Sequence, residues 1–149
     1  MAISRGAGTE IIRSIHLEDV NDTARPLIVG EQHHIYTVLS IIVMAYTVQA
    51  AGNYTKCYLQ GYDSLGGTTD ESHYIFSQDM QSQQTYVFND KFSFNGFEPT
   101  DFAGPMDDAT KQNAIADQGS SVAQTLKIAA EDSSDGFDVT CTFLDQNNE

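Results

Sequence analysis

One apolar run constrains the fold of this chain more than any other feature. Residues 31–46 read EQHHIYTVLSIIVMAY, and from Ile35 onward β-branched and aromatic side chains dominate. Such residues favour extended strands. A strand this apolar is normally covered on both faces, as in the middle of a packed sheet. We therefore expect a central strand in which most of the following are buried: Ile35, Val38, Leu39, Ile41, Ile42 and Val43.

Shorter strand patterns surround this run and are separated by Gly, Asn and Asp turns. Tyr54, Tyr58 and Tyr62 point to one side of a strand, whereas Thr55, Cys57 and Leu59 point to the other. In a second segment, alternation along the strand places four aromatic residues on one inner face: Tyr86, Phe88, Phe92 and Phe94. A tight turn at Asn89-Asp90 would break this alternation. The last segment gives one face to Phe137, Val139, Cys141 and Phe143. About seven or eight strands at such spacing predict an all-β fold, a single antiparallel β-sandwich or jelly roll.

We expect one folded domain with two flanking segments. Residues 1–13 are predicted to form a flexible, extended N-terminal arm, residues 14–145 the β-sandwich domain, and residues 146–149 a solvated tail. Small residues such as Gly6 and Gly8 cannot hold the arm in one conformation. Ile3, Arg5 and Arg13 nevertheless give it anchors, which favours a role in assembly.

The charge of the chain excludes some classes of partner. It has 21 acidic and seven basic residues and a formal net charge of −14. Binding to nucleic acid or to anionic lipid needs clustered Lys and Arg, so neither is expected. The longest apolar run, residues 35–51, contains Tyr, Thr, Ser and Gln and is too polar for a membrane span. The N-terminus has no apolar signal-peptide core, so we expect synthesis in a host cytoplasm without a cleavable signal.

No catalytic, cofactor or metal site is expected. No nucleophile elbow of the Gly-x-Ser-x-Gly type occurs, so an enzyme is not predicted. His33 and His34 are adjacent on a strand and point to opposite faces, which prevents them from sharing one ion. The acidic segment Glu131–Asp138 favours solvated turns, with calcium binding as the alternative. Cys57 and Cys141 are predicted to be two buried free thiols, and a disulfide remains open if their strands are neighbours.

The layout of the chain resembles small structural proteins of tailed bacteriophages, of the marine or cyanobacterial type. The resemblance lies in the short arm, the early core strand His34–Val43, the segment Thr85–Phe92 and the ending Val139–Asp145. It implies a virion component without catalysis, often trimeric, and it transfers no site residues. Such proteins coat the capsid as decoration or cement proteins, or form parts of the neck, tail or fibres.

We therefore predict a capsid decoration protein, located in the virion, that binds and stabilises the exterior of a phage head. Its expected partners are capsid or other virion proteins and further copies of itself, with a trimer favoured. The alternatives are a tail, neck or baseplate component and, from another class, a carbohydrate-binding β-sandwich module. Aromatic stripes on strands serve intramolecular packing, protein contacts or sugar binding. The predicted interface residues are Ile3, Arg5, Arg13, Tyr54, Tyr58 and Tyr62.

Overall fold

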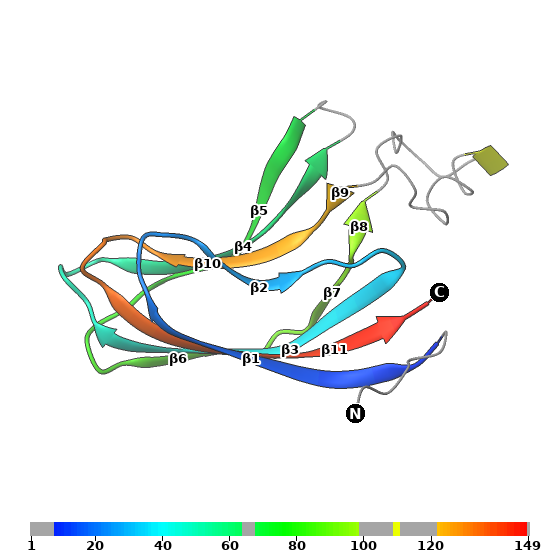
Figure 1. Ribbon diagram of the computed structural model, residues 1–149. Coiled ribbons are helices and arrows are strands. Elements are labelled where there is room, and N and C mark those ends of the chain that lie inside the picture. The colour runs from blue at the N-terminus through cyan, green and yellow to red at the C-terminus, as the bar shows by residue number, and fades with distance from the viewer. Residues whose placement is uncertain (1–7, 64–67, 99–108, 111–121, 149) are drawn as a thin grey trace.

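Two antiparallel sheets face each other in the computed structural model, which describes residues 8–63, 68–98, 109–110 and 122–148 (Figure 1). The first sheet has the order β1 (Glu10–Val20), β11 (Gly136–Asn147) and β3 (His34–Thr47), followed by β6 (Thr85–Phe88) and β7 (Phe92–Asn95) along the outer edge of β3. The second sheet has the order β2 (Arg25–Val29), β10 (Thr125–Ala130), β4 (Tyr54–Asp63) and β5 (Thr68–Asp79). A short ribbon joins β8 (Phe97–Glu98) to β9 (Val122–Ala123).

The predicted all-β sandwich is confirmed. The described residues form eleven strands, more than the seven or eight expected. The difference arises because the segment 85–95 is interrupted at residues 89–91 and because the ribbon adds two very short strands. Within the described part of the chain, no helix has the length and apolar character that a membrane crossing needs.

The core lies between the sheets and is built mainly by alternation along each strand. In β11 every second residue from Phe137 onward is buried, so the predicted inner face of this strand is confirmed. From the second sheet, Cys57, Leu126 and Ile128 are fully buried against it. The paired residues of antiparallel strands share a face, so these alternations align into one apolar layer.

A one-residue bulge explains why the long apolar run does not alternate. Val38 pairs with Phe143 and Ser40 with Thr142, so Leu39 is an extra residue with no opposite partner in β11. The bulge shifts the parity of the strand. Inward residues are therefore even-numbered before it and odd-numbered after it, namely His34, Tyr36, Val38, Ile41, Val43 and Ala45.

The outer face of β3 is not covered by the described residues. Val38, Ile41 and Val43 are fully buried as predicted, but Ile42 is 40% exposed and Ile35 and Leu39 are only partly buried. The expectation that this strand is covered on both sides is therefore wrong for Ile42. The apolar side chains of the run serve two surfaces, one inside the sandwich and one outside it.

An aromatic edge closes one side of the first sheet. Both β6 and β7 pair with β3, and residues 89–91 interrupt the edge without changing its parity. The predicted inner face is confirmed, because its four aromatic residues pack against the core: Tyr86, Phe88, Phe92 and Phe94. The ring of Phe94 stacks on that of Tyr36 with centroids 5.4 Å apart.

Strand β1 begins and strand β11 ends at the same end of the first sheet. Strand β1 starts at Glu10, which pairs with Gln146, so residues 10–13 belong to a strand and not to the predicted arm. Strand β11 continues to Asn147, two residues beyond the predicted domain end. Residues 1–7 and 149 lie outside the described residues. The division into arm, sandwich and tail stays a prediction, with its first boundary moved to about Gly8.

The connection between β2 and β3 crosses the connection between β7 and β8 in backbone contact near this end of the molecule. A Cβ atom on Gly30 would lie 2.0 Å from the carbonyl oxygen of Gly96, and one on Gly96 would lie 2.0 Å from that of Glu31. Only glycine permits such an approach. The Gly30 N–H donates to the Gln124 carbonyl at 2.8 Å, which ties the crossing to the segment before β10. The crossing fixes Glu31 beside the gap between the two sheets.

Candidate functional site

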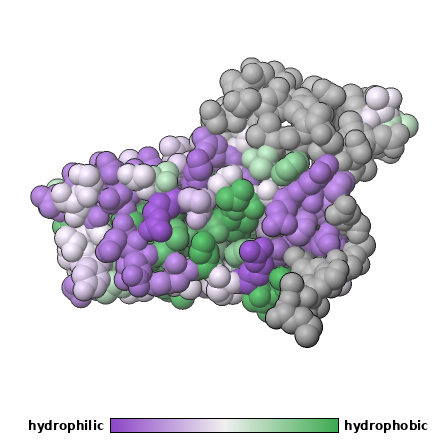
Figure 2. All heavy atoms as spheres, viewed as in Figure 1, coloured by the Kyte–Doolittle hydropathy of each residue, from purple (hydrophilic) through white to green (hydrophobic). Residues whose placement is uncertain are grey.

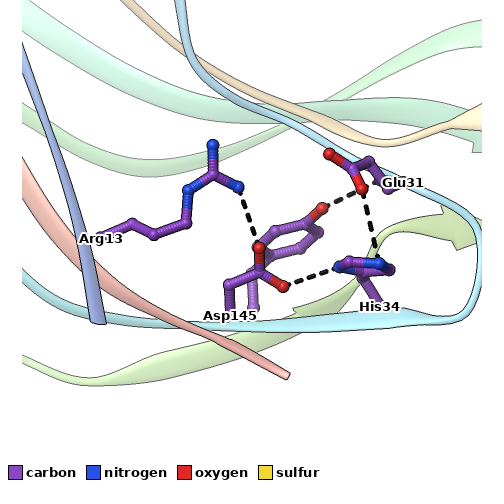
Figure 3. A network of polar contacts seen from close by, with 5 residues as sticks. Arg13, Glu31, His34 and Asp145 are labelled. Carbon is purple, nitrogen blue, oxygen red and sulfur yellow. Dashed lines mark hydrogen bonds and ion pairs between the residues drawn. The ribbon is translucent and has the colours of Figure 1, made fainter. Parts of the chain in front are cut away.

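A cluster of charged side chains links three strands and one turn (Figure 3). Asp145 on β11 is fully buried. One of its carboxylate oxygens accepts a hydrogen bond from Nη1 of Arg13 at 2.9 Å, and the other lies 2.7 Å from Nδ1 of His34. The second ring nitrogen of His34 lies 3.4 Å from the carboxylate of Glu31. The carboxylate of Asp145 is thus paired on both sides, as a buried charge requires.

Tyr36 is hydrogen-bonded to the backbone of Glu31, a member of this cluster. Its hydroxyl oxygen accepts a hydrogen bond from the Glu31 backbone N–H at 3.0 Å, which anchors the turn before β3. Burial raises the pKa of Tyr36 to about 12, so its phenol stays protonated. The guanidinium of Arg13 also lies 5.4 Å from the ring centroid of Phe143, a distance that allows a cation–π contact.

The chemistry of the cluster favours a structural role. A histidine hydrogen-bonded to a buried carboxylate also occurs in hydrolases, where the other ring nitrogen activates a nucleophile. Here that nitrogen faces the Glu31 carboxylate instead of a serine or cysteine. Among the described residues, no group of three metal-ligating side chains could hold an ion. The cluster joins β1, β3 and β11 and provides one polar end of a groove.

The groove runs between the edge strands β1 and β2. Its volume is about 310 Å³, and its lining is mostly apolar apart from Arg13 and Glu31: Arg13, Ile15, Pro26, Leu27, Ile28, Val29, Glu31 and Phe143. Figure 2 shows apolar residues gathering between the two layers on this side of the molecule. An apolar recess bordered by two edge strands is suited to bind an extended chain segment.

A second surface covers the outside of the first sheet. We call it the ladder face, and its residues lie in three rows across the strands: Ile12, Ser14, His16, Thr37, Ser40, Ile42, Val87, Ser93, Thr140, Thr142 and Leu144. These eleven residues include no carboxylate, although the chain has 21 acidic residues. Ile12, Ile42 and Val87 are 69%, 40% and 51% exposed. The ladder face is therefore a patch without carboxylates on a strongly acidic protein, and Asp138 and Glu18, whose carboxylate lies 3.8 Å from Nε2 of His16, border it.

Hydroxyl groups on the ladder face bond to neighbours across the strands. Thr37 Oγ1 lies 2.8 Å from Ser93 Oγ, and Thr140 Oγ1 lies 2.8 Å from Nδ1 of His16. Ser14 and Thr142 make a longer contact of 3.3 Å. Because these groups already have partners, a protein that covers the face would leave few polar atoms unsatisfied.

The predicted tyrosine stripe lies on the opposite side of the molecule. Tyr54 and Tyr58 are half-buried on the outer face of the second sheet, and Tyr58 packs against the exposed Tyr74 with ring centroids 5.7 Å apart. Nζ of Lys56 lies 6.0 Å from the ring centroid of Tyr54. A shallow recess of about 240 Å³ is lined by Tyr54, Lys56, Tyr74 and Ser77.

The structure does not bring the predicted interface residues together. Arg13 is engaged with Asp145 and Phe143 at the groove, whereas Tyr54 and Tyr58 lie on the outer face of the other sheet. The positions of Ile3, Arg5 and the side chain of Tyr62 lie outside the described residues. Sequence reasoning missed Asp145, although it continues the inward parity of Phe137, Val139, Cys141 and Phe143. An acidic residue at an inward position was the signal for a buried charge.

The acidic segment 131–138 contains a buried carboxylate with an internal role. Asp135 accepts hydrogen bonds from the backbone N–H of Gln49 at 2.8 Å and of Asp132 at 3.1 Å, and from the side-chain amide of Asn53 at 3.2 Å. It therefore joins the β10–β11 turn to the β3–β4 turn. Its oxygens are used by protein donors, so the predicted solvated turn is wrong at Asp135, which is 5% exposed.

Both cysteines are buried and free, as predicted. They lie on facing strands, Cys57 on β4 and Cys141 on β11. Burial raises the pKa of both thiols, that of Cys141 from 9.0 to about 12. Ionised Cys141 would raise the pKa of Cys57 further, so the two lie close enough to interact.

This burial predicts a loss of stability in alkaline solution. The folded chain binds the thiol protons more tightly than the unfolded chain, so the stabilising contribution is complete below about pH 9. It is lost as the pH rises from 9 towards 12. Urea unfolding across this range should show a falling free energy of unfolding, and a Cys57→Ala/Cys141→Ala variant should show a shallower fall. A thiol reagent that labels the native chain within seconds at pH 8 would contradict the burial.

No protein-family model and no curated protein sequence matches the chain. Among solved structures it is similar to a Bacillus endospore appendage from disulfide-linked pili, with a TM-score of 0.43 and 11% identity over 100% of this chain and 97% of that one. It is also similar to a chain of infectious bursal disease virus Gx strain, with a TM-score of 0.46 and 8% identity over 99% of this chain and 36% of that one. The chain thus spans about a third of that viral protein. These values assign neither a family nor a function.

Proposed function

We propose that this chain is a structural protein of a virion, and specifically a decoration protein that attaches to the outside of a phage head. The observation that carries the proposal is the ladder face. It is a sheet surface whose residues include no carboxylate and several exposed apolar side chains, on a chain of net charge −14. The layout of the sequence, which resembles phage structural proteins, supplies the identity of the partner.

Desolvation determines which surfaces of an acidic protein can be covered by a partner. Burying a carboxylate against a partner is costly unless a cation pairs with it. The ladder face avoids this cost, and the cores of protein interfaces are likewise depleted in charged residues. Ile12, Ile42 and Val87 provide apolar area that a partner would remove from water.

The remaining acidic surface fits a role on the exterior of a particle. Carboxylates that face solvent keep particles soluble and make them repel one another. A lattice repeats the same contact many times, so individually weak contacts give firm attachment when copies are linked to each other. A trimer is the oligomer we favour on the basis of the resemblance. A tail, neck or baseplate component could use the same face, and the copy number per particle separates these roles.

Charge introduced on the ladder face should abolish attachment. Ile42→Glu and Val87→Glu place a carboxylate in the proposed interface, and we expect each to weaken binding to particles that lack the protein by roughly tenfold or more. Co-sedimentation with such particles measures the effect. Tyr74→Glu, at an exposed position on the second sheet, is the matched control and should bind normally. Unchanged melting temperatures would show that all three variants fold.

The same variants distinguish the alternatives. Normal attachment of Ile42→Glu and Val87→Glu would overturn the ladder face as the docking surface. Loss of attachment in Tyr74→Glu alone would move the docking surface to the second sheet. Saturable binding to a polysaccharide column, lost in Tyr74→Glu, would favour the carbohydrate-binding module, for which the recess beside Tyr54, Lys56 and Tyr74 is the candidate site.

A further inference from the structure

We propose that the groove between β1 and β2 receives the N-terminal residues 1–7 of a second copy of this chain, which add as an extra strand to the edge of β1. This contact joins copies of the chain to each other and is separate from the ladder face. Three features support this contact: the open edge of β1, the lining of the groove, and the sequence of residues 1–7, which are the part of the arm meant below.

The edge of β1 is open over a defined stretch. Within the described residues β1 pairs with β11 alone and β2 with β10 alone, so both are edge strands of their sheets. Pro26 removes a backbone donor from β2, which protects that edge. On β1, Nη1 of Arg25 donates to the Glu18 carbonyl at 2.7 Å and covers the far end. The stretch Glu10–His16 contains no proline and remains available for pairing.

Length agrees with this assignment. The open stretch Glu10–His16 has seven residues, the same number as the proposed occupant, residues 1–7. Strands of this length are common in sheets. Seven extended residues reach about 23 Å, which allows the arm to leave its own subunit and follow the edge of a neighbour.

The lining of the groove matches the side chains of the arm. Alternate residues of an added strand would face the groove, and Ile3 and Arg5 share a parity. The groove offers Ile15, Leu27 and Phe143 to an apolar side chain. At its polar end it offers the carboxylate of Glu31, whose side chain is 60% exposed. An arm antiparallel to β1 with Ile3 opposite Ile15 would place Arg5 opposite Arg13, whose charge is paired with Asp145, and on the side of the groove that Glu31 lines.

The connection at Gly8 bears on which copy supplies the arm. The Gly8 N–H donates to the Asn147 carbonyl, so the chain is still held beside the end of β11 at this residue. To reach its own β1 edge, the arm would have to reverse direction at Gly8, which lies in a turn with a φ of 78°, so docking on the same subunit is the alternative that the cross-linking experiment tests. The arm of a second copy needs no such reversal, and the exchange can be reciprocal in a closed oligomer.

A charge exchange tests the contact in the full chain. Arg5→Glu and Glu31→Arg should each weaken self-association about tenfold or more in sedimentation equilibrium, because each places like charges together. The double variant should recover most of the lost association. Deletion of residues 2–7 should give a monomer that melts close to the full chain. Lys127→Glu, on the outer face of the second sheet, is the control and should associate normally.

Cross-linking identifies which copy supplies the arm. A tagged Ile3→Cys chain is mixed with an untagged Val29→Cys chain, both containing the buried Cys57 and Cys141. A mixed disulfide between the two chains is the expected product. The proposal is overturned if the full chain is monomeric at all concentrations, if the deletion variant associates like the full chain, or if the double charge variant shows no recovery. It is also overturned if the disulfide forms only when both new cysteines are in one chain.

Discussion

Replacement of Ile41 by alanine is expected to lower the free energy of unfolding by about 2–5 kcal/mol. Ile41 is fully buried in the middle of β3, between Cys141 on β11 and Phe88 on β6. Truncation removes apolar surface from the core and leaves a cavity that the neighbouring strands cannot fully close. Chemical denaturation at neutral pH measures the loss.

The adjacent residue provides a matched control. Ile42 has the same side chain on the same strand but lies on the ladder face, 40% exposed. Ile42→Ala should cost less than about 1 kcal/mol in the isolated chain, because little buried volume is lost. Equal losses for the two variants would show that Ile42 is covered in solution, for example by another copy, and would contradict the open outer face.

Replacement of Asp145 by alanine is also expected to lower the free energy of unfolding by a large amount. It removes the acceptor for Arg13 and the partner of His34, and it leaves a buried histidine next to an empty site. Breaking one partner of a buried pair costs about 3–5 kcal/mol. Part of that cost is reduced here because Arg13 is about half exposed and can regain water. We therefore expect a loss near 3 kcal/mol.

Asp138 on the same strand is the control for this prediction. It lies on the outer side of β11 and accepts a hydrogen bond from the Asp19 backbone N–H at 3.3 Å. Asp138→Ala should cost less than about 1 kcal/mol. Thermal and urea unfolding of both variants provide the comparison. A loss below about 1 kcal/mol for Asp145→Ala would mean that the cluster contributes little to stability.

Much of the fold could be predicted because its signals are local. The alternation of Phe137, Val139 and Cys141 depends only on the two-residue period of a strand. The aromatic edge formed by Tyr86 and Phe94 follows from the same period and survives the interruption at residues 89–91. Both segments keep one parity from end to end, so a reading of the sequence assigns their inner faces correctly.

The surfaces that could bind partners depend on contacts between distant segments, and local patterns do not contain them. The ladder face combines β1, β11, β3, β6 and β7 in an order that the sequence does not reveal. The bulge at Leu39 also hid the division of β3 into an inner and an outer side. Without knowledge of the bulge, the apolar run predicts burial on both sides of the strand, including burial of Ile42.

The bulge at Leu39 also bears on misfolding. A long apolar strand is at risk of pairing with β11 in the wrong alignment, since a slip by two residues would preserve the side-chain alternation of a regular strand. In β3 the residues that face the core are even-numbered before Leu39 and odd-numbered after it. A slip would move the bulge to a different position in the strand. On one side of the bulge, Ser40 or another half-buried residue would then face the core. Only one alignment satisfies both halves. The same irregularity that obscures the pattern in the sequence thus disfavours misaligned and aggregated forms.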